Sequence, residues 1–370
     1  MTTPDWMYQL NHHQRYDYHG PEDLPDYRWP GNKRLAVYVA MNLEHFSFGC
    51  SEGAKLSQAA NKLDILNYSW RDYGNRVGGW HLADLFQQLE LPASVICNTS
   101  ILDYCPQLLE RWMANGQSEL IAHGHTNSER QGELDVRAEN EMIAMCQQRL
   151  SGWSGKSVEG WLSPWISESQ DTPDLLRHNG FSYTLNWAHD DRPVTFSTRH
   201  GELLSVPYPQ EINDIPTIIP NGASAELFCQ MMLDQLAEML ARSEQQTLVM
   251  GIALHPYIVG QPFRFWHLKK ALATLAGQRD RFWLTTPRRD CQTPQSAGQS
   301  LINPPGNGVA RAWSTTALQG RRVGRKTAPA YCHPGRQRRR SSRPDPPAAL
   351  ALCAARLQLS PLPFFDRSLL

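Results

Sequence analysis

Three side chains able to bind a metal or move a proton follow apolar runs of the sequence. Glu44, His123 and His255 come shortly after runs that end at residues 41, 122 and 254. Short runs of this kind, rich in β-branched and aromatic residues, predict strands buried on both faces, as in a parallel sheet. At the carboxyl ends of parallel strands, side chains meet in the crevice where ligands bind. The sequence therefore predicts that these three residues share one active site.

Further candidates lie at or near the same predicted strand ends. His125 follows His123 by two residues, and an imidazole there is able to bind a metal or transfer protons. The other candidates are predicted to contact substrate, and they are Ser163, Trp165, Glu129 and Asp191. Two alternatives stay open. The polar residues 127–129 have the composition that caps a following helix, and the acidic pair 190–191 is suited either to orient a catalytic histidine or only to solvate a loop.

Alternating strands and helices are predicted to position these residues. The predicted strands are 34–41, 93–97, 119–122, 157–162, 181–185, 203–206, 247–254 and 282–285, and the predicted helices are 80–91, 104–113, 133–150, 173–178, 225–241 and 265–276. This alternation indicates right-handed β-α-β units and a parallel sheet or barrel. Seven or eight units in roughly 250 residues fit a barrel of the TIM type better than an open sheet.

Charge divides the chain into unlike parts. The 370 residues carry no net charge and 41% are hydrophobic, which allows a large core and gives no sign of a nucleic-acid or membrane partner. Residues 288–370, however, contain 13 Arg, one Lys, three Asp and no Glu. We expect an N-terminal arm at 1–33, a barrel at 34–287 and a disordered or non-native tail at 288–370. The tail is either a basic arm for an acidic partner or the product of a shifted reading frame, and the abrupt loss of Glu and Lys favours the second.

Cysteine usage and the N-terminal sequence bear on the compartment. The eight cysteines are irregularly spaced and form no C-x-x-C pair, which predicts free thiols in a reducing environment. The first residues are polar, with no basic segment before an apolar stretch, so no signal peptide is predicted. No apolar run approaches the length of a bilayer span. We therefore expect a cytoplasmic protein.

From about residue 28 to residue 287 the chain resembles the polysaccharide deacetylase superfamily, also called the NodB-homology domain. Four of its motifs have counterparts here. They are Asn42-Leu43-Glu44 for the paired aspartates that end the first strand, His123 with Asn127 for H-[ST]-x-x-H, Leu162-Ser163-Pro164-Trp165 for R-x-P-[YW], and Leu254-His255 for L-x-H. The resemblance implies an irregular (β/α)7 barrel. It also implies a hydrolase of non-peptide C–N bonds that removes acetyl from an N-acetylated sugar or a related amide.

The same resemblance implies roles for the strand-end residues. Amide cleavage requires an activated water, a donor to the oxyanion and an acid for the leaving nitrogen. Glu44 corresponds to the base, His255 to the acid and His123 to a metal ligand or a group that polarises the carbonyl. A divalent metal such as zinc would be held by Glu44, His123 and His125.

Departures from the motifs keep other functions open. Asn42 is unable to accept a proton, and Asn127 is a poorer metal ligand than histidine. The N-x-E pattern is similar to a subgroup that includes metal-independent allantoinases and intracellular peptidoglycan deacetylases. A cyclic-ureide hydrolase, or an inactive binding protein on the same barrel, is therefore an alternative. The expected partner is a glycan or a small molecule, and although such barrels often form homo-oligomers, the sequence identifies no interface.

Overall fold

The computed structural model of the protein describes residues 12–23, 26–50, 52–58 and 63–289. All of them lie in the unit Met1–Ala310, one of two compact units of the chain. The predicted tail falls almost wholly outside the described residues. Arg288 is described, however, and its backbone N–H donates to Glu119 while its guanidinium pairs with Glu159 at 2.7 Å. Ordered contacts therefore continue at least through Arg288.

The described elements alternate as the sequence predicts. The strands are β1 (Leu35–Leu43), β2 (Ser94–Cys97), β3 (Glu119–Ala122), β4 (Gly160–Trp161), β5 (Tyr183–Thr184), β6 (Val194–Thr198), β7 (Gly201–Ser205), β8 (Leu248–Leu254) and β9 (Trp283–Leu284). The α-helices are α1 (Ile65–Tyr73), α2 (Gly79–Gln88), α3 (Ile101–Tyr104), α4 (Pro106–Met113), α5 (Val136–Ser154), α6 (Thr172–His178), α7 (Asp214–Ile218), α8 (Ala225–Arg242), α9 (Pro256–Val259) and α10 (Pro262–Ala276). The shorter helical turns are η1 (Pro21–Asp23), η2 (Pro30–Asn32), η3 (Gly74–Gly78), η4 (Gln131–Glu133) and η5 (Pro164–Ile166).

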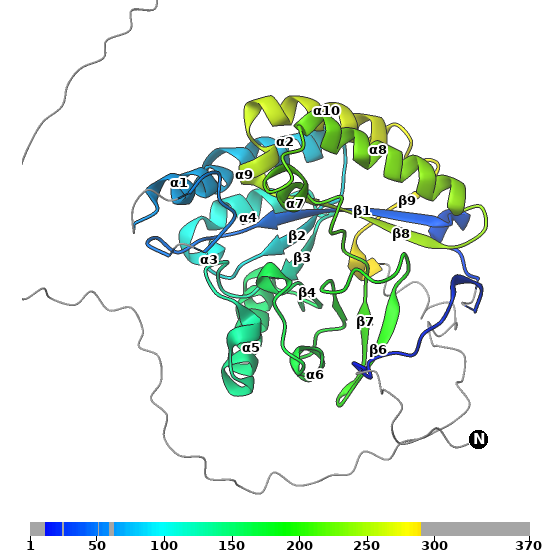
Figure 1. The fold of residues 1–370 in the computed structure, drawn as a ribbon, viewed down its shortest axis with the longest axis horizontal. Coiled ribbons are helices and arrows are strands. Elements are labelled where there is room, and N and C mark those ends of the chain that lie inside the picture. Colours follow the sequence, from blue (N-terminus) through cyan, green and yellow to red (C-terminus); the bar gives the residue numbers. More distant parts are fainter. Residues whose placement is uncertain (1–11, 24–25, 51, 59–62, 290–370) are drawn as a thin grey trace, which may run out of the picture. The chain divides into compact units, whose positions relative to one another are not determined.

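One curled sheet carries all nine described strands, in the order β6-β7-β5-β4-β3-β2-β1-β8, with β9 also paired to β1. The long strand β1 is central, because its residues Leu35–Met41 pair in parallel with the whole of β8 on one edge. On the other edge, β9 pairs with the start of β1 and β2 with its end. Helices α2, α8 and α10 lie along one side of β1 and β8 (Figure 1).

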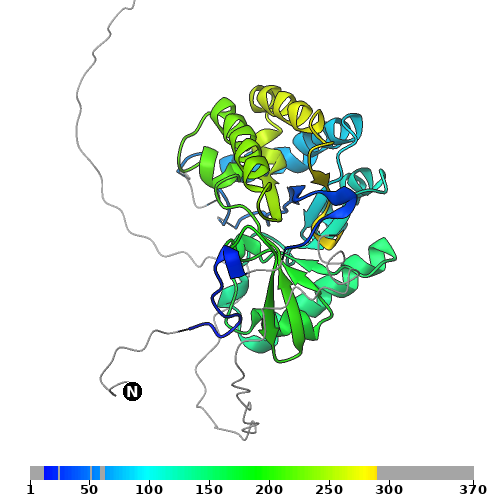
Figure 2. The same ribbon diagram turned by 90° about the vertical axis from the view of Figure 1, so that its right-hand side faces the viewer.

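The predicted irregular α/β barrel of the deacetylase type is confirmed, and its irregularity is that the ladder stays open. Among the described strands, β8 and β6 end the ladder and do not pair with each other. Loop backbone occupies the free edge of β8, where the N–H groups of Val249 and Ala253 donate to the carbonyls of Asp191 and Ile212. The β6–β7 hairpin is antiparallel and lies far from α8 and α10 (Figure 2).

Several elements were not predicted from the sequence. Strand β6 has only one buried residue, Phe196, so it lacks the apolar run of the other strands. Helices α7 and α9 have five and four residues, too few for a helical period to be visible. Helix α1 lies between the predicted strand 34–41 and the predicted helix 80–91, where the sequence predicted no element.

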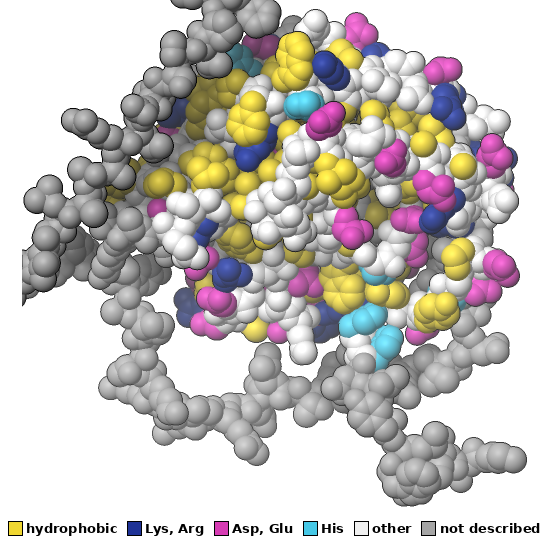
Figure 3. All heavy atoms as spheres, turned by 45° about the horizontal axis from the view of Figure 1, so that its top comes forward, with side chains coloured by type: hydrophobic (Ala, Val, Ile, Leu, Met, Phe, Trp, Pro, Cys, Tyr) yellow, Lys and Arg dark blue, Asp and Glu magenta, His cyan; other side chains and the backbone are white. Residues whose placement is uncertain are grey.

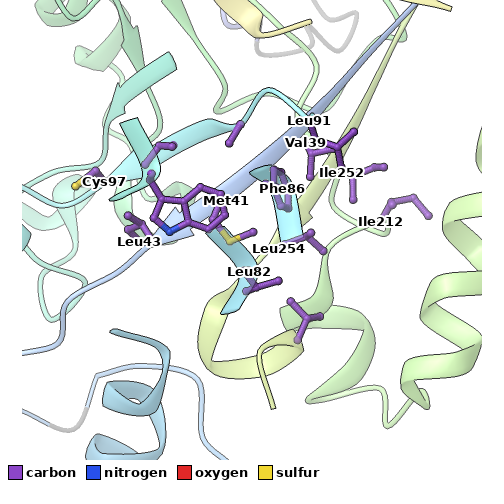
Figure 4. Packing of buried hydrophobic residues seen from close by; sticks show 14 of the residues in the cluster. Val39, Met41, Leu43, Leu82, Phe86, Leu91, Cys97, Ile212, Ile252 and Leu254 are labelled. Carbon is purple, nitrogen blue, oxygen red and sulfur yellow. The ribbon is translucent and has the colours of Figure 1, made fainter. Parts of the chain in front are cut away.

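The core surrounds β1 on both faces. Figure 4 shows Val39, Met41 and Leu43 of β1 in one cluster with Leu82 and Phe86 of α2. The alternate residues of β1 belong to a second cluster on the opposite face of the sheet. All nine residues of β1 are buried, so the strand is a fixed support for whatever follows its carboxyl end.

The surface mixes apolar and charged side chains. On the face shown in Figure 3, acidic and basic groups are interspersed with exposed hydrophobic ones. The largest exposed hydrophobic residues include Phe48, Phe263 and Trp266. In the part of the chain that the structure describes, no helix is both long and apolar enough for a membrane span.

Glycines allow unusually close packing behind the end of β8. A Cβ built on Gly78 of η3 would clash with the backbone oxygen of Pro256 in α9, the residue that follows His255. A Cβ on Gly74 would lie 2.7 Å from the backbone nitrogen of Tyr257. Real Cβ atoms do not approach backbone so closely, so these glycines are required for η3 to pack against α9.

We expect Gly78→Ala to destabilise the protein by about 1–3 kcal/mol, because the added methyl displaces the backbone next to His255. The matched control is Gly152→Ala in helix α5, where an added Cβ meets nothing within 4 Å. That change is expected to be neutral or to stabilise by up to about 1 kcal/mol. Urea unfolding measures both, and equal effects of the two substitutions would contradict this packing argument.

Candidate active site

Three strand ends bring Glu44, His123 and His255 to one cavity of about 180 Å³. Glu44 follows β1, His123 follows β3 and His255 follows β8. The parallel pairing of β1 with β8 and, through β2, with β3 sets their carboxyl ends side by side. The structure therefore brings together the three residues that the sequence predicts to share a site.

Glu44 lies between the two histidines. Its Oε1 is 3.4 Å from Nε2 of His255 and 3.6 Å from Nε2 of His123. All three side chains are almost fully buried. Burial alone would raise the pKa of Glu44, but the positive charge of His255 and the close approach of both histidines to the carboxylate lower it to about 2. Glu44 is thus a carboxylate at neutral pH.

Asp214 holds His255 in place. Its Oδ1 accepts from Nδ1 of His255 at 2.6 Å, and its Oδ2 accepts from the backbone N–H of His255 at 2.8 Å. Because a carboxylate only accepts, the proton on Nδ1 is fixed and Nε2 points to Glu44. Burial alone would lower the pKa of His255, but the carboxylates of Asp214 and Glu44 raise it to about 10. His255 is therefore an imidazolium at neutral pH.

Asp214 was missed from the sequence, where we considered the pair Asp190 and Asp191 for this role. That interpretation is wrong for His255, since Asp214 makes both of its contacts. The cap Asn213 accepts from the backbone N–H of Ile215 and starts the short helix α7. An Asn-Asp pair at a helix start was the one available signal, and it is a weak one.

The second nitrogen of His123 has no partner. Its Nδ1 lies 2.7 Å from the carbonyl oxygen of Leu162 and must donate to it. In the described structure, Nε2 of His123 and Oε2 of Glu44 are buried without a hydrogen-bond partner. Buried polar atoms in proteins are nearly always satisfied, so these two orphaned atoms indicate a place for a ligand or a water.

The two asparagines of the motifs are already engaged. Asn42 donates to the hydroxyl of Tyr208 at 3.0 Å and to the carbonyl of Leu254 at 3.1 Å. Asn127 accepts through Oδ1 from Asn98 at 2.9 Å. Both line the cavity, and these bonds hold their side chains in the cavity wall.

Not every predicted site residue reaches the cavity. Ser163 and Trp165 line it, whereas His125, Glu129 and Asp191 do not. The chain turns at Gly124, whose φ is +61°, so the strand alternation stops there and Nδ1 of His125 lies 2.9 Å from the hydroxyl of Thr99. Glu129 is exposed. Asp191 is also exposed and lines a separate cavity of about 670 Å³ beside α8.

The donor set does not fit a zinc ion. Zinc sites in proteins use three or four side-chain ligands. Among the described residues, no group of three His, Cys, Asp or Glu side chains is arranged to hold a metal. Glu44 and His123 would supply two ligands, but His125 is directed to Thr99 and His255 is held as a cation. The structure therefore does not bring Glu44, His123 and His125 together as one set of ligands.

The fold of the chain is similar to the folds of known proteins. The structure superposes on the PuuE allantoinase with a TM-score of 0.67 at 22% identity, covering 75% of this chain and 95% of that one. It superposes on a probable polysaccharide deacetylase from Pseudomonas aeruginosa PAO1 with a TM-score of 0.65 at 24% identity, covering 74% and 94%. The chain has the polysaccharide deacetylase fold. The predicted resemblance to this superfamily is confirmed at the level of the fold.

Similarity in sequence covers less of the chain than similarity in structure. A curated peptidoglycan deacetylase of Helicobacter pylori (strain ATCC 700392 / 26695) is 25% identical over 173 residues, which is 45% of this chain. The match spans 58% of the length of that relative. No protein-family model matches the chain.

Stability should depend on pH through His255. Its pKa is raised in the folded state, so its stabilising contribution is complete below about pH 6.5 and is lost as the pH rises towards about 10. We expect the free energy of unfolding to fall over this interval, and His255→Gln to remove much of that slope. The control His200→Gln alters an exposed ring and should keep the slope. Equal slopes in all three proteins, measured by urea unfolding, would contradict the assignment.

Proposed function

We propose that the protein hydrolyses a non-peptide C–N bond, with Glu44 as general base and His255 as general acid. The observation that supports this is the buried carboxylate of Glu44 between two imidazoles, with Oε2 of Glu44 and Nε2 of His123 unpartnered. Amide hydrolysis uses a base for the attacking water and an acid for the leaving nitrogen, and the cavity holds one candidate for each.

Glu44 is placed to activate water. A water bound to Oε2 would satisfy that orphaned oxygen and lose a proton to it as the water attacks the carbonyl carbon. A carboxylate with a pKa near 2 is a weak base at rest. Its basicity rises, however, once His255 has given up the proton whose charge depresses the pKa of Glu44. Proton uptake by Glu44 and proton release by His255 therefore assist each other.

His255 is placed to protonate the leaving nitrogen. Asp214 keeps the proton on Nδ1, so the proton that transfers is the one on Nε2, which faces Glu44. Loss of that proton leaves a neutral ring still bonded to Asp214. His123 is fixed by the carbonyl of Leu162, and its unpartnered Nε2 would hold the attacking water or the substrate in the cavity.

The substrate that the cavity suits best is a small amide or cyclic ureide. The cavity of about 180 Å³ is smaller than the roughly 300–1,000 Å³ of ordinary ligand sites. A set of ligands that does not fit zinc agrees with a reaction by the chain's own groups. The similarity to a peptidoglycan deacetylase supports removal of acetyl from an N-acetylated sugar as the second candidate.

A cytoplasmic location and domain boundaries near 33 and 287 remain predictions.

We expect Glu44→Gln and Asp214→Asn to lower kcat by at least about 10²-fold, because the first removes the base and the second removes the group that keeps the acid charged. The assay follows allantoin and N-acetylglucosamine oligomers, with and without a chelator. Glu133→Gln is the matched control, since Glu133 is an exposed glutamate outside the cavity.

Full activity of Glu44→Gln would remove Glu44 from the mechanism. Activity abolished by the chelator and restored by zinc would contradict a reaction without metal. Binding of either compound with no turnover under any condition would favour the inactive binding protein.

A further inference from the structure

The turn after β4 has strained backbone at two successive residues. Trp165 has φ +64° and Ile166 has φ +52°, in the left-handed region. L-residues other than Gly, Asn and Asp rarely adopt it, and for a β-branched residue it is a genuine outlier. Strain of this kind persists only where surrounding contacts enforce it, and it concentrates at functional sites.

The surrounding contacts are specific. The N–H of Ile166 donates to the carbonyl of Ser163 at 2.8 Å, which closes the turn. The indole N–H of Trp165 donates to the carbonyl of Asn127 at 3.0 Å. Pro164 packs so closely on Gly124 that a Cβ there would lie 2.6 Å from its ring. The turn is thus tied to the segment that carries His123.

The strained residues line the same cavity as Glu44 and His255. Ile166 is part-buried and packs against the second core cluster. Ile215 and Pro216 of α7 also line this cavity and add further apolar surface. Glycine at position 166 would adopt the same backbone without strain, so the isoleucine side chain is retained at a cost in stability and serves to fill space in the site.

We propose that Ile166 determines substrate size: its side chain is an apolar wall that admits a compact amide or cyclic ureide and excludes a glycan chain. This rests on the proposed function, because it names the substrate class of that site. The wall carries no hydrogen-bonding group, so it selects by shape. Removing it should open the cavity towards the turn without touching Glu44, His123 or His255.

The strain is tested by comparing glycine with alanine at one position. Both Ile166→Gly and Ile166→Ala remove the side chain beyond Cβ, but only glycine, which has no Cβ, relieves the positive φ. We expect the glycine variant to have the higher Tm, by about 2–4 °C. Ile215 in helix α7 is the control, where the order should reverse because glycine disfavours a helix. The same order at both positions would overturn the strain argument.

The wall is tested by binding in a Glu44→Gln background, so that turnover does not interfere. Calorimetry with allantoin and with di-N-acetylchitobiose gives a ratio of affinities. We expect Ile166→Gly to shift that ratio towards the sugar by at least about tenfold, the scale of apolar-pocket discrimination. An unchanged ratio, or no binding of either compound to any variant, would overturn the proposal.

The outcome is separable from that of the proposed function. If the ratio of affinities shifts but the unmodified chain hydrolyses neither compound, the role of Ile166 is supported and the proposed reaction is contradicted. If the unmodified chain hydrolyses either compound but the ratio of affinities is unchanged, the proposed reaction is supported and the role of Ile166 is contradicted.

Discussion

The active site depends on a cluster of three charged side chains in the interior of the protein. Glu44 and Asp214 are buried carboxylates, and His255 lies between them with both ring nitrogens directed at carboxylate oxygens. Unpaired buried charges are costly, so each of these groups depends on the others to stay ionised. The same arrangement that stabilises the charges also produces an acid and a base within 3.4 Å.

The fold is organised to hold this cluster still. Strand β1 delivers Glu44 from a core that is buried on both faces, and its parallel pairing with β8 fixes His255 alongside. Asp214 arrives from α7, whose preceding residue Asn213 bridges to Ala253 of β8. The glycines of η3 let α9 pack closely behind His255. The segment that supplies Asp214 thus also covers part of the free edge of β8.

Sequence reasoning succeeded where the signal was a buried strand. The apolar runs before Glu44, His123 and His255 predicted both the sheet and the meeting of these residues, because parallel strands align their carboxyl ends. It failed for His125, since Gly124 at φ +61° ends the alternation that would have placed the ring in the cavity. It also missed Asp214, because a five-residue helix leaves no periodic pattern. The strained Ile166 has no sequence signature, because backbone dihedral angles at a turn depend on tertiary contacts such as Trp165 with Asn127.

The ionisation of His255 is the most direct test of this account. The ring nitrogens of ¹⁵N-labelled histidine report their protonation by NMR, and His255→Gln assigns the signal. We predict that both nitrogens of His255 carry protons at pH 8 and that the ring titrates near pH 10. A ring that loses its proton at or below about pH 6.5, the ordinary value for histidine, would contradict the charged cluster and the acid–base pair built on it.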